Sequence, residues 1–220
     1  MDQNITDPSF FYKDKFFAGP MLKVSNLPFR LLCLENGADG VFGPAINSEA
    51  VIASQIDENN IFYLGNPSKN EILFRTDPIE KGKLVFQLFS NDSAKTIKAV
   101  ERIYPYVSAI DINCGCPSNF ATSGGLGSAM METPELISDI LSSLRRNFPS
   151  TLPLSVKFRI FEEDGNSSVI DNSVVQVDDN IKLTRNVEKT IQFAQACENS
   201  GASAVILHGR PAKNRHKGEV

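Results

Sequence analysis

The chain has 220 residues, 41% of them hydrophobic, and its formal net charge at pH 7 is −4. These values are typical of a globular protein with one large domain or two small ones, and they lack the basic excess that is common among nucleic-acid-binding proteins. No run of 18 apolar residues indicates a transmembrane helix, so no membrane partner is expected. The first residues resemble neither a signal peptide nor an Arg-rich presequence, so we expect a cytoplasmic protein, with the nucleus as a further compartment.

Apolar strand-like runs alternate with amphipathic segments along the chain. We expect strands at residues 15–21, 40–46, 83–89, 109–115, 153–160 and 204–210. We expect helices at residues 27–39, 93–105, 133–147 and 186–203, and a polar loop at 47–82. Ser93 and Thr133 are the expected N-caps of the second and third helices, Pro134 follows Thr133, and Gly37 is the expected C-terminal cap of the first helix.

The order of these elements predicts the fold class, which is α/β. Nearly continuous apolar strands separated by helices indicate a parallel sheet covered by helices. Polar residues follow the carboxyl ends of the strands, where (β/α)8 barrels build their active sites. A doubly wound sheet also binds ligands there, but the chain lacks the GxGxxG and GxxxxGK[ST] patterns. We therefore predict a (β/α)8 TIM barrel, of which residues 1–220 supply six β/α units.

Charge and cysteine content add three expectations. Residues 162–180 hold six acidic and no basic residues, which predicts an acidic surface insertion at 162–185. Residues 210–220 hold four Lys or Arg and one Glu, a composition that suits phosphate binding as well as a solvated tail. The four cysteines are few and scattered, which indicates reduced thiols. Cys114 and Cys116 have no second ligand pair at a suitable spacing, so no metal site is expected.

The segment DINCGCPSNFATSGGLGSAMM, residues 111–131, places a thiol and three glycines directly after a strand. Cys116 lies beyond the strand, where side chains can reach solvent. A thiol is mostly protonated at neutral pH, so Cys116 could act as a general acid or, beside a base, as a nucleophile. A small buried structural residue is the alternative. The glycines suit either a plain turn or a close approach of the backbone to a ligand.

Cationic side chains follow two further strands. Lys157 and Arg159 share one side of their strand because the side-chain period is two. Two cations at a barrel mouth require an anionic or electron-rich partner, unless the pair faces outward into solvent. His208 ends an apolar run before Gly209, and a structural histidine is as good an interpretation as a functional one.

Taken together, five segments resemble the flavin-dependent tRNA-dihydrouridine synthases, in particular the eukaryotic branch that acts on tRNA position 20. They are GPMLKVSNLPFRLL (19–32), FQLF (86–89), DINCGCPSNFATSGGLGSAMM (111–131), VKFRI (156–160) and ILHGR (206–210). The resemblance implies an FMN-binding barrel, NADPH as the reductant, tRNA as the substrate, and a monomer as the full-length form. It implies hydride transfer from the reduced flavin to C6 of a flipped uracil and protonation at C5.

The resemblance also assigns residues by motif position. Cys116 is the implied acid that protonates C5. The implied cofactor-binding residues are Pro20, Met21, Gln87, Lys157 and His208. The implied substrate-binding residues are Asn113 and Arg159.

The chain departs from the family pattern in four places. Ser123 stands where many members carry Lys, and Ala45 lies where relatives often carry an acid. The insertion at 162–185 is longer than the usual link. Barrel strands 7 and 8 and the helical tRNA-binding domain are not represented, so we expect residues 1–220 alone to be inactive and colourless. The alternatives are another FMN-barrel oxidoreductase that acts on a free pyrimidine, and a truncated non-catalytic remnant.

Overall fold

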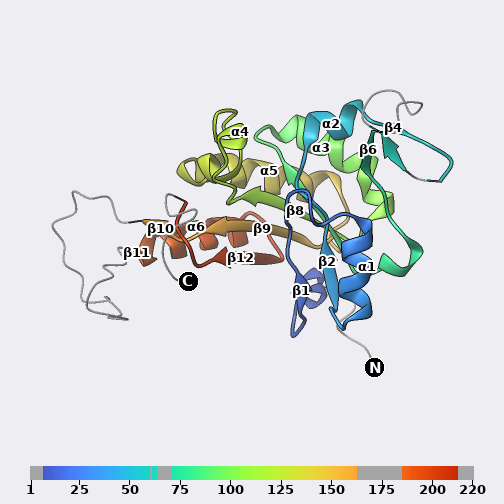
Figure 1. Ribbon diagram of the computed structural model, residues 1–220. Helices are drawn as coiled ribbons and strands as arrows, with labels where there is room; N and C mark the ends of the chain where they lie inside the picture. Colours follow the sequence, from blue (N-terminus) through green and yellow to red (C-terminus); the bar gives the residue numbers. More distant parts are fainter. Residues whose placement is uncertain (1–6, 60, 64–70, 163–184, 213–220) are drawn as a thin grey trace.

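The computed structural model describes residues 7–59, 61–63, 71–162 and 185–212 (Figure 1). Their main sheet runs in the order β1–β2–β7–β8–β9–β12, and every neighbouring pair is parallel. These strands span Phe17–Ala18, Gly40–Phe42, Leu84–Phe89, Ala109–Cys114, Leu154–Arg159 and Ala204–His208. The spatial order follows the chain order without a reversal, which is the arrangement of a (β/α)8 barrel and not of a doubly wound sheet.

Helices lie along one face of this sheet, outside the curve that the strands describe (Figure 1). They are α1 (Leu27–Glu35), α2 (Ser48–Ala53), α3 (Ser93–Ile103), α5 (Pro134–Asn147) and α6 (Val187–Asn199). The helix α3 packs against both α2 and α5, and α5 packs against α6. The predicted partial (β/α)8 barrel with six parallel strands is therefore confirmed.

Helix boundaries follow local capping chemistry. Gly37 has φ +92° directly after the cap residue of α1, and Pro134 begins α5 after Thr133. The cap expected at Ser93 is wrong, because Asp92 precedes α3 and its carboxylate accepts the Lys95 N–H at 2.8 Å. The Asp92 cap satisfies a backbone N–H that the helix end leaves unpaired, whereas Thr133 precedes α5 without a side-chain cap hydrogen bond.

The segment from 40 to 82 differs most from expectation. The strand expected at 40–46 is divided into β2 and β3 (Ile46–Asn47), which both pair with β7, because Pro44 between them has no N–H to donate. The expected polar loop instead contains α2 and an antiparallel sheet of β4 (Gln55–Ile56), β5 (Phe62–Tyr63) and β6 (Ile72–Phe74). Figure 1 shows this small sheet beside α2.

Short elements complete the described chain. Two strands, β10 (Phe161–Glu162) and β11 (Arg185–Asn186), pair antiparallel and bring together the two flanks of the predicted acidic insertion. The insertion between them lies outside the described residues. The remaining helical turns are η1 (Pro8–Phe11), η3 (Pro78–Glu80), η4 (Tyr104–Tyr106), α4 (Asn119–Thr122) and η5 (Gly127–Glu132).

The two faces of the sheet carry different side chains. Toward the helices the strands present apolar residues such as Phe86, Ile110 and Val156, which are fully buried in the main core. On the inner face, a second apolar cluster of Phe42, Val85 and Ala109 fills the amino end, covered by η1 and Tyr12. Beyond this cluster, in the direction of the carboxyl ends of the strands, the inner face carries polar side chains.

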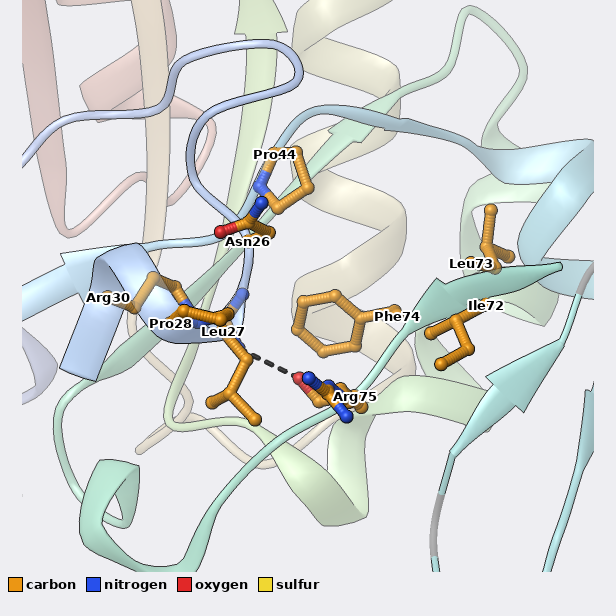
Figure 2. A pocket seen from close by; sticks show the side chains of 9 residues that line it. All are labelled: Asn26, Leu27, Pro28, Arg30, Pro44, Ile72, Leu73, Phe74 and Arg75. Carbon is orange, nitrogen blue, oxygen red and sulfur yellow. Dashed lines mark hydrogen bonds between the residues drawn. The ribbon is translucent and has the colours of Figure 1, made fainter. Parts of the chain in front are cut away.

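A buried ion pair ties α1 to the segment before β7. Arg30 and Glu80 are both 1% exposed, and the guanidinium contacts both carboxylate oxygens, at 2.5 and 3.0 Å. Arg30 also donates to the carbonyls of Ser25 and Arg75 at 3.0 and 2.8 Å. Figure 2 shows this arginine in the wall of a pocket between α1, Pro44 and β6, with Phe74 at its centre.

We expect Glu80→Gln to lower the free energy of unfolding by about 3–5 kcal/mol, because it leaves the Arg30 charge buried without its counter-charge. Denaturant unfolding of the intact gene product measures this loss. The control is Lys95→Gln, which breaks the solvent-exposed pair with Glu49 and should leave the midpoint unchanged. Equal effects of the two variants would contradict the structural role of the buried pair.

Candidate active site

Three rows of polar side chains cross the inner face of the sheet. Parallel register aligns Gln87 with Asp111 and Ser155. The next row joins Asn113, Lys157 and Ile206, and the row after it joins Arg159 with His208. These seven polar residues come from four different strands, so the sheet brings together groups that lie more than 100 residues apart in the sequence.

Cys116 lies on the turn that follows β8, as expected, and its side chain is partly exposed. Its backbone N–H donates to Asn113 Oδ1 at 2.9 Å, and the Gly115 N–H donates to the same oxygen at 3.1 Å. The thiol donates a hydrogen bond to the Ser118 hydroxyl, and the distance from Sγ to Oγ is 3.4 Å. Cys114, by contrast, is fully buried in the main core, so only Cys116 can present a thiol toward the barrel mouth.

The glycine cluster supports the Cys116 turn from behind. Gly127 has φ +62°, and a Cβ placed there would lie 2.4 Å from the carbonyl oxygen of Cys116. That same carbonyl accepts the Ser128 N–H at 2.9 Å. Gly125 also has a positive φ, and the Asn91 side chain donates to the neighbouring Gly124 carbonyl at 2.9 Å. At least one glycine therefore serves the close packing of two backbone segments, while an approach of the cluster to substrate stays a prediction.

A buried amide network reaches the same turn. Asn113 Nδ2 donates to Gln87 Oε1 at 2.9 Å, and Gln87 Nε2 donates to Asp111 Oδ2 at 2.6 Å. Ser155 Oγ donates to the other Asp111 oxygen at 2.6 Å, and Tyr12 OH donates to Ser155 Oγ at 3.1 Å. Burial raises the pKa of Asp111 to about 6, against the opposing effect of these hydrogen bonds and of Lys157.

Lys157 is a half-buried cation on the inner face. Val156 and Phe158, its neighbours along β9, are buried on the other side, as the two-residue period predicts. Burial lowers the pKa of Lys157, Asp111 raises it, and Arg159 lowers it further. Within the described chain its ammonium group makes no hydrogen bond or ion pair. A partly desolvated cation that lacks a direct anionic contact is suited to an anionic or electron-rich ligand.

His208 is held in one tautomer. Its Nδ1 accepts the backbone N–H of Arg210 at 3.1 Å, so the proton of the neutral ring lies on Nε2. Burial lowers the pKa of His208, and the nearby cations Arg159, Lys157 and Arg210 lower it further. At neutral pH the ring is therefore an uncharged donor through Nε2.

Arg159 joins two loops. Its Nε donates to the Gly115 carbonyl at 2.7 Å, and its Nη1 donates to the carbonyls of Arg210 and Pro211 at 3.1 and 3.3 Å. These contacts connect the Cys116 turn with the loop after His208. Direct contact of Arg159 with a substrate base stays a prediction.

Pro20 and Met21 follow the first strand at the same end of the sheet. The Met21 N–H donates to the Ser25 hydroxyl at 2.8 Å, and its side chain is 42% exposed. No hydrogen bond joins these two residues to the polar rows within the described chain, and their role toward a cofactor stays a prediction.

Sequence reasoning missed Asp111, Ser155 and Tyr12. The signal for Asp111 was available, because it lies two residues before Asn113 and therefore on the same face of its strand. Tyr12 and Ser155 are separated by 143 positions, and only the folded chain shows that they meet. The pocket in Figure 2 contains none of the predicted site residues.

The donor set fits a flavin and gives no sign of a metal centre. Lys157 Nζ and His208 Nε2 present donors from two neighbouring strands, which suits the carbonyl and nitrogen edge of an isoalloxazine ring. Gln87 is buried, and its Nε2 already donates to Asp111. Among the described residues, no three His, Cys, Asp or Glu side chains lie together in a way that could hold a metal ion. None of the helices in the described part of the chain is long and apolar enough to cross a membrane.

We expect Gly127→Ala to destabilise the protein by about 1–3 kcal/mol, because Ala is strained at a positive φ and its Cβ would overlap the Cys116 carbonyl. Gly124→Ala is the matched control, since its nearest neighbour, the Ala121 carbonyl, is 3.6 Å from the added Cβ. Thermal unfolding and the rate of Cys116 alkylation by iodoacetamide measure the difference. Unchanged values in the Gly127 variant would show that the glycine does not hold the turn.

Comparison with known proteins identifies the family. The family model described as "Dihydrouridine synthase (Dus)" matches residues 16–179. The tRNA-dihydrouridine(20) synthase [NAD(P)+] of Schizosaccharomyces pombe is 32% identical over 211 residues, which cover 93% of this chain and 40% of that protein. The enzyme of the same name from Saccharomyces cerevisiae is 36% identical over 162 residues, covering 69% and 42%. The tRNA-dihydrouridine(16/17) synthase of S. pombe is 29% identical over 198 residues, covering 90% and 41%.

The chain thus spans about two fifths of the length of these curated relatives. The matched segment contains Cys116, Asn113, Gln87 and Lys157, and His208 lies beyond it. The family match covers more than half of the chain and coincides with a parallel sheet of barrel order. The chain belongs to the dihydrouridine synthase family.

Proposed function

We propose that the intact protein reduces a uridine in the D-loop of tRNA, at position 20, to 5,6-dihydrouridine, with FMN as the bound cofactor and NADPH as the reductant. The observation that carries this proposal is the meeting of a partly exposed thiol, a half-buried ammonium group and an uncharged imidazole at the carboxyl ends of adjacent strands. Family membership and the names of the relatives, two of which are named for position 20, support it.

FMN would be held by Gln87, Lys157 and His208, with Pro20 and Met21 at the turn after β1, and when bound it would supply the hydride for C6 of the uracil. Lys157 would place a positive charge where negative charge gathers on reduction. His208, fixed as an Nε2–H donor, would add a hydrogen bond without adding charge. A neutral His208 therefore adds no further positive charge beside Lys157 and Arg159 at neutral pH.

Asn113 can offer the substrate only a donor. Its Oδ1 already accepts two backbone N–H groups, and one of its two amide protons is given to Gln87. The remaining N–H suits a uracil carbonyl oxygen and does not suit the N3–H. Arg159 would act near the base through the two loops that it joins.

Cys116 would hold the proton for C5 on its Sγ. Within the described chain, the hydrogen-bond partner of this thiol is the Ser118 hydroxyl, which is a weak base. The thiol therefore remains a proton donor and not an activated nucleophile, which agrees with a reaction that needs no covalent enzyme intermediate.

We expect Cys116→Ala in the intact gene product to leave bleaching of the flavin by NADPH near normal. Oxidation of the reduced protein by tRNA should slow by about 10²- to 10⁴-fold, the range for loss of a general acid. Stopped-flow absorbance measures both steps. Cys33→Ala, which removes a partly buried thiol from α1, is the control and should behave as the unmodified protein. Unchanged dihydrouridine formation in the Cys116 variant would disprove the assignment, and turnover of free uracil in place of tRNA would favour a free-pyrimidine oxidoreductase.

We expect Lys157→Ala to lower FMN occupancy, or to slow reduction by NADPH by about 10- to 10³-fold, because a cation that stabilises the reduced ring is lost. Affinity for tRNA should change less. Flavin content, the reduction rate and tRNA binding by gel shift check the three statements. Lys95→Ala, on the outer helix layer, is the control. Full flavin content with unaltered reduction kinetics would remove Lys157 from the cofactor site.

A further inference from the structure

One buried carboxylate on the inner face has no part in the proposed reaction. Asp111 is 0% exposed and occupies the middle of β8, between Gln87 on β7 and Ser155 on β9. The inner-face neighbours below it, Val85 and Ala109, are apolar and equally buried. An apolar side chain would therefore suit packing at this position, and an ionised carboxylate is costly there. Its presence requires a reason other than filling space.

The hydrogen-bond directions around Asp111 are fixed by chemistry. An ionised carboxylate only accepts, so Gln87 must turn its Nε2 toward Asp111 and its Oε1 toward Asn113. At the other end of this hydrogen-bond network are the backbone N–H groups of Gly115 and Cys116, which can only donate. Asn113 must therefore turn its Oδ1 toward them. Because both ends have a fixed polarity, each of the two amides has one satisfied orientation.

The far end of this network is the catalytic turn itself. Strand β8 ends at Cys114, and within the described chain the N–H groups of Gly115 and Cys116 both donate to Asn113 Oδ1 and to no strand of the sheet. A change in the orientation of Gln87 would deprive Asn113 Nδ2 of its acceptor and loosen that hold. The link from Asp111 to Cys116 is therefore continuous through two amides.

We propose that Asp111 is a positioning residue that, through Gln87 and Asn113, holds the backbone turn carrying Cys116 and fixes where the thiol stands. The importance of that position for catalysis rests on the proposed function, whereas the position itself does not. The charge of Lys157 on β9 also acts on Asp111. The Ser155 hydroxyl donates to the carboxylate and accepts in turn from the Tyr12 hydroxyl.

The test compares variants of Asp111 in the intact gene product. Asp111→Val keeps a similar volume and offers no acceptor, and Asp111→Ala serves if the valine variant does not fold. In either, alkylation of Cys116 by iodoacetamide, followed by mass spectrometry of its peptide, should become at least about threefold faster as the turn loosens. Asp111→Asn should restore the original rate to within about twofold, because its Oδ1 can accept from Gln87 while its Nδ2 donates to Ser155.

Ser155→Ala is the matched control. It removes a hydrogen bond to the same carboxylate from the opposite side, away from the route to Cys116, so it should lower stability without changing the alkylation rate. An unchanged rate in the folded Val or Ala variant would overturn the proposal, and so would an equal acceleration in Ser155→Ala.

Activity separates this proposal from the proposed function. If the unmodified protein forms dihydrouridine, Asp111→Val should lower kcat by about tenfold or more while KM for tRNA changes less than threefold, and Asp111→Asn should recover most of kcat. A change confined to KM would contradict a role in placing the thiol. If the unmodified protein does not act on tRNA, the proposed function fails, and the alkylation rates still decide whether Asp111 positions the turn.

Discussion

The site depends on one constraint, the burial of an acceptor-only carboxylate at the centre of a parallel sheet. Asp111 has no access to water, so its lone pairs must be satisfied by donors on neighbouring strands, and Gln87 and Ser155 supply them. Burial raises its pKa to about 6, which means that the ionised form is disfavoured in the folded state. Its contribution to stability is therefore greatest at acidic pH and is lost as the pH rises through 6. At neutral pH the buried, ionised carboxylate of Asp111 therefore destabilises the fold, and it fixes the orientation of the Gln87 and Asn113 amides.

The same geometry explains how three cationic or titratable groups share a small space. Lys157 lies one row above Asp111, whose charge opposes the lowering of the lysine pKa by burial. Arg159 distributes its donors over three backbone carbonyls, and His208 stays neutral because burial and the adjacent cations lower its pKa. Within the described chain the Lys157 ammonium group makes no hydrogen bond or ion pair, and its side chain lies on the inner face of the sheet.

The pattern of apolar residues was sufficient to locate the six strands and four main helices. The two-residue period placed Lys157 and Arg159 on one side of their strand, and the structure shows that this side is the inner face. Local patterns could not reveal the interruption at Pro44, since it depends on how two short strands share β7. They also missed the cap at Asp92, where an adjacent Ser offered an equally good local signal. The network of Tyr12, Ser155 and Asp111 depends on contacts between distant segments, which no single segment encodes. The positions of Pro20 and Met21 relative to a cofactor stay predictions for the same reason.

The contacts of Arg159 also change how the two halves of the site should be understood. The Cys116 turn follows β8 and the His208 loop follows β12, and the strand β9 separates them in the sheet. A guanidinium with donors in a rigid plane can hold carbonyls from both loops at once, and Arg159 does so. In the proposed reaction, Cys116 protonates one carbon of the base while His208 lies on the side of the cofactor. The distance between proton donor and cofactor would then be set by an arginine that need not touch the substrate, so its removal should disturb the relative placement of the two loops before it affects recognition of the base.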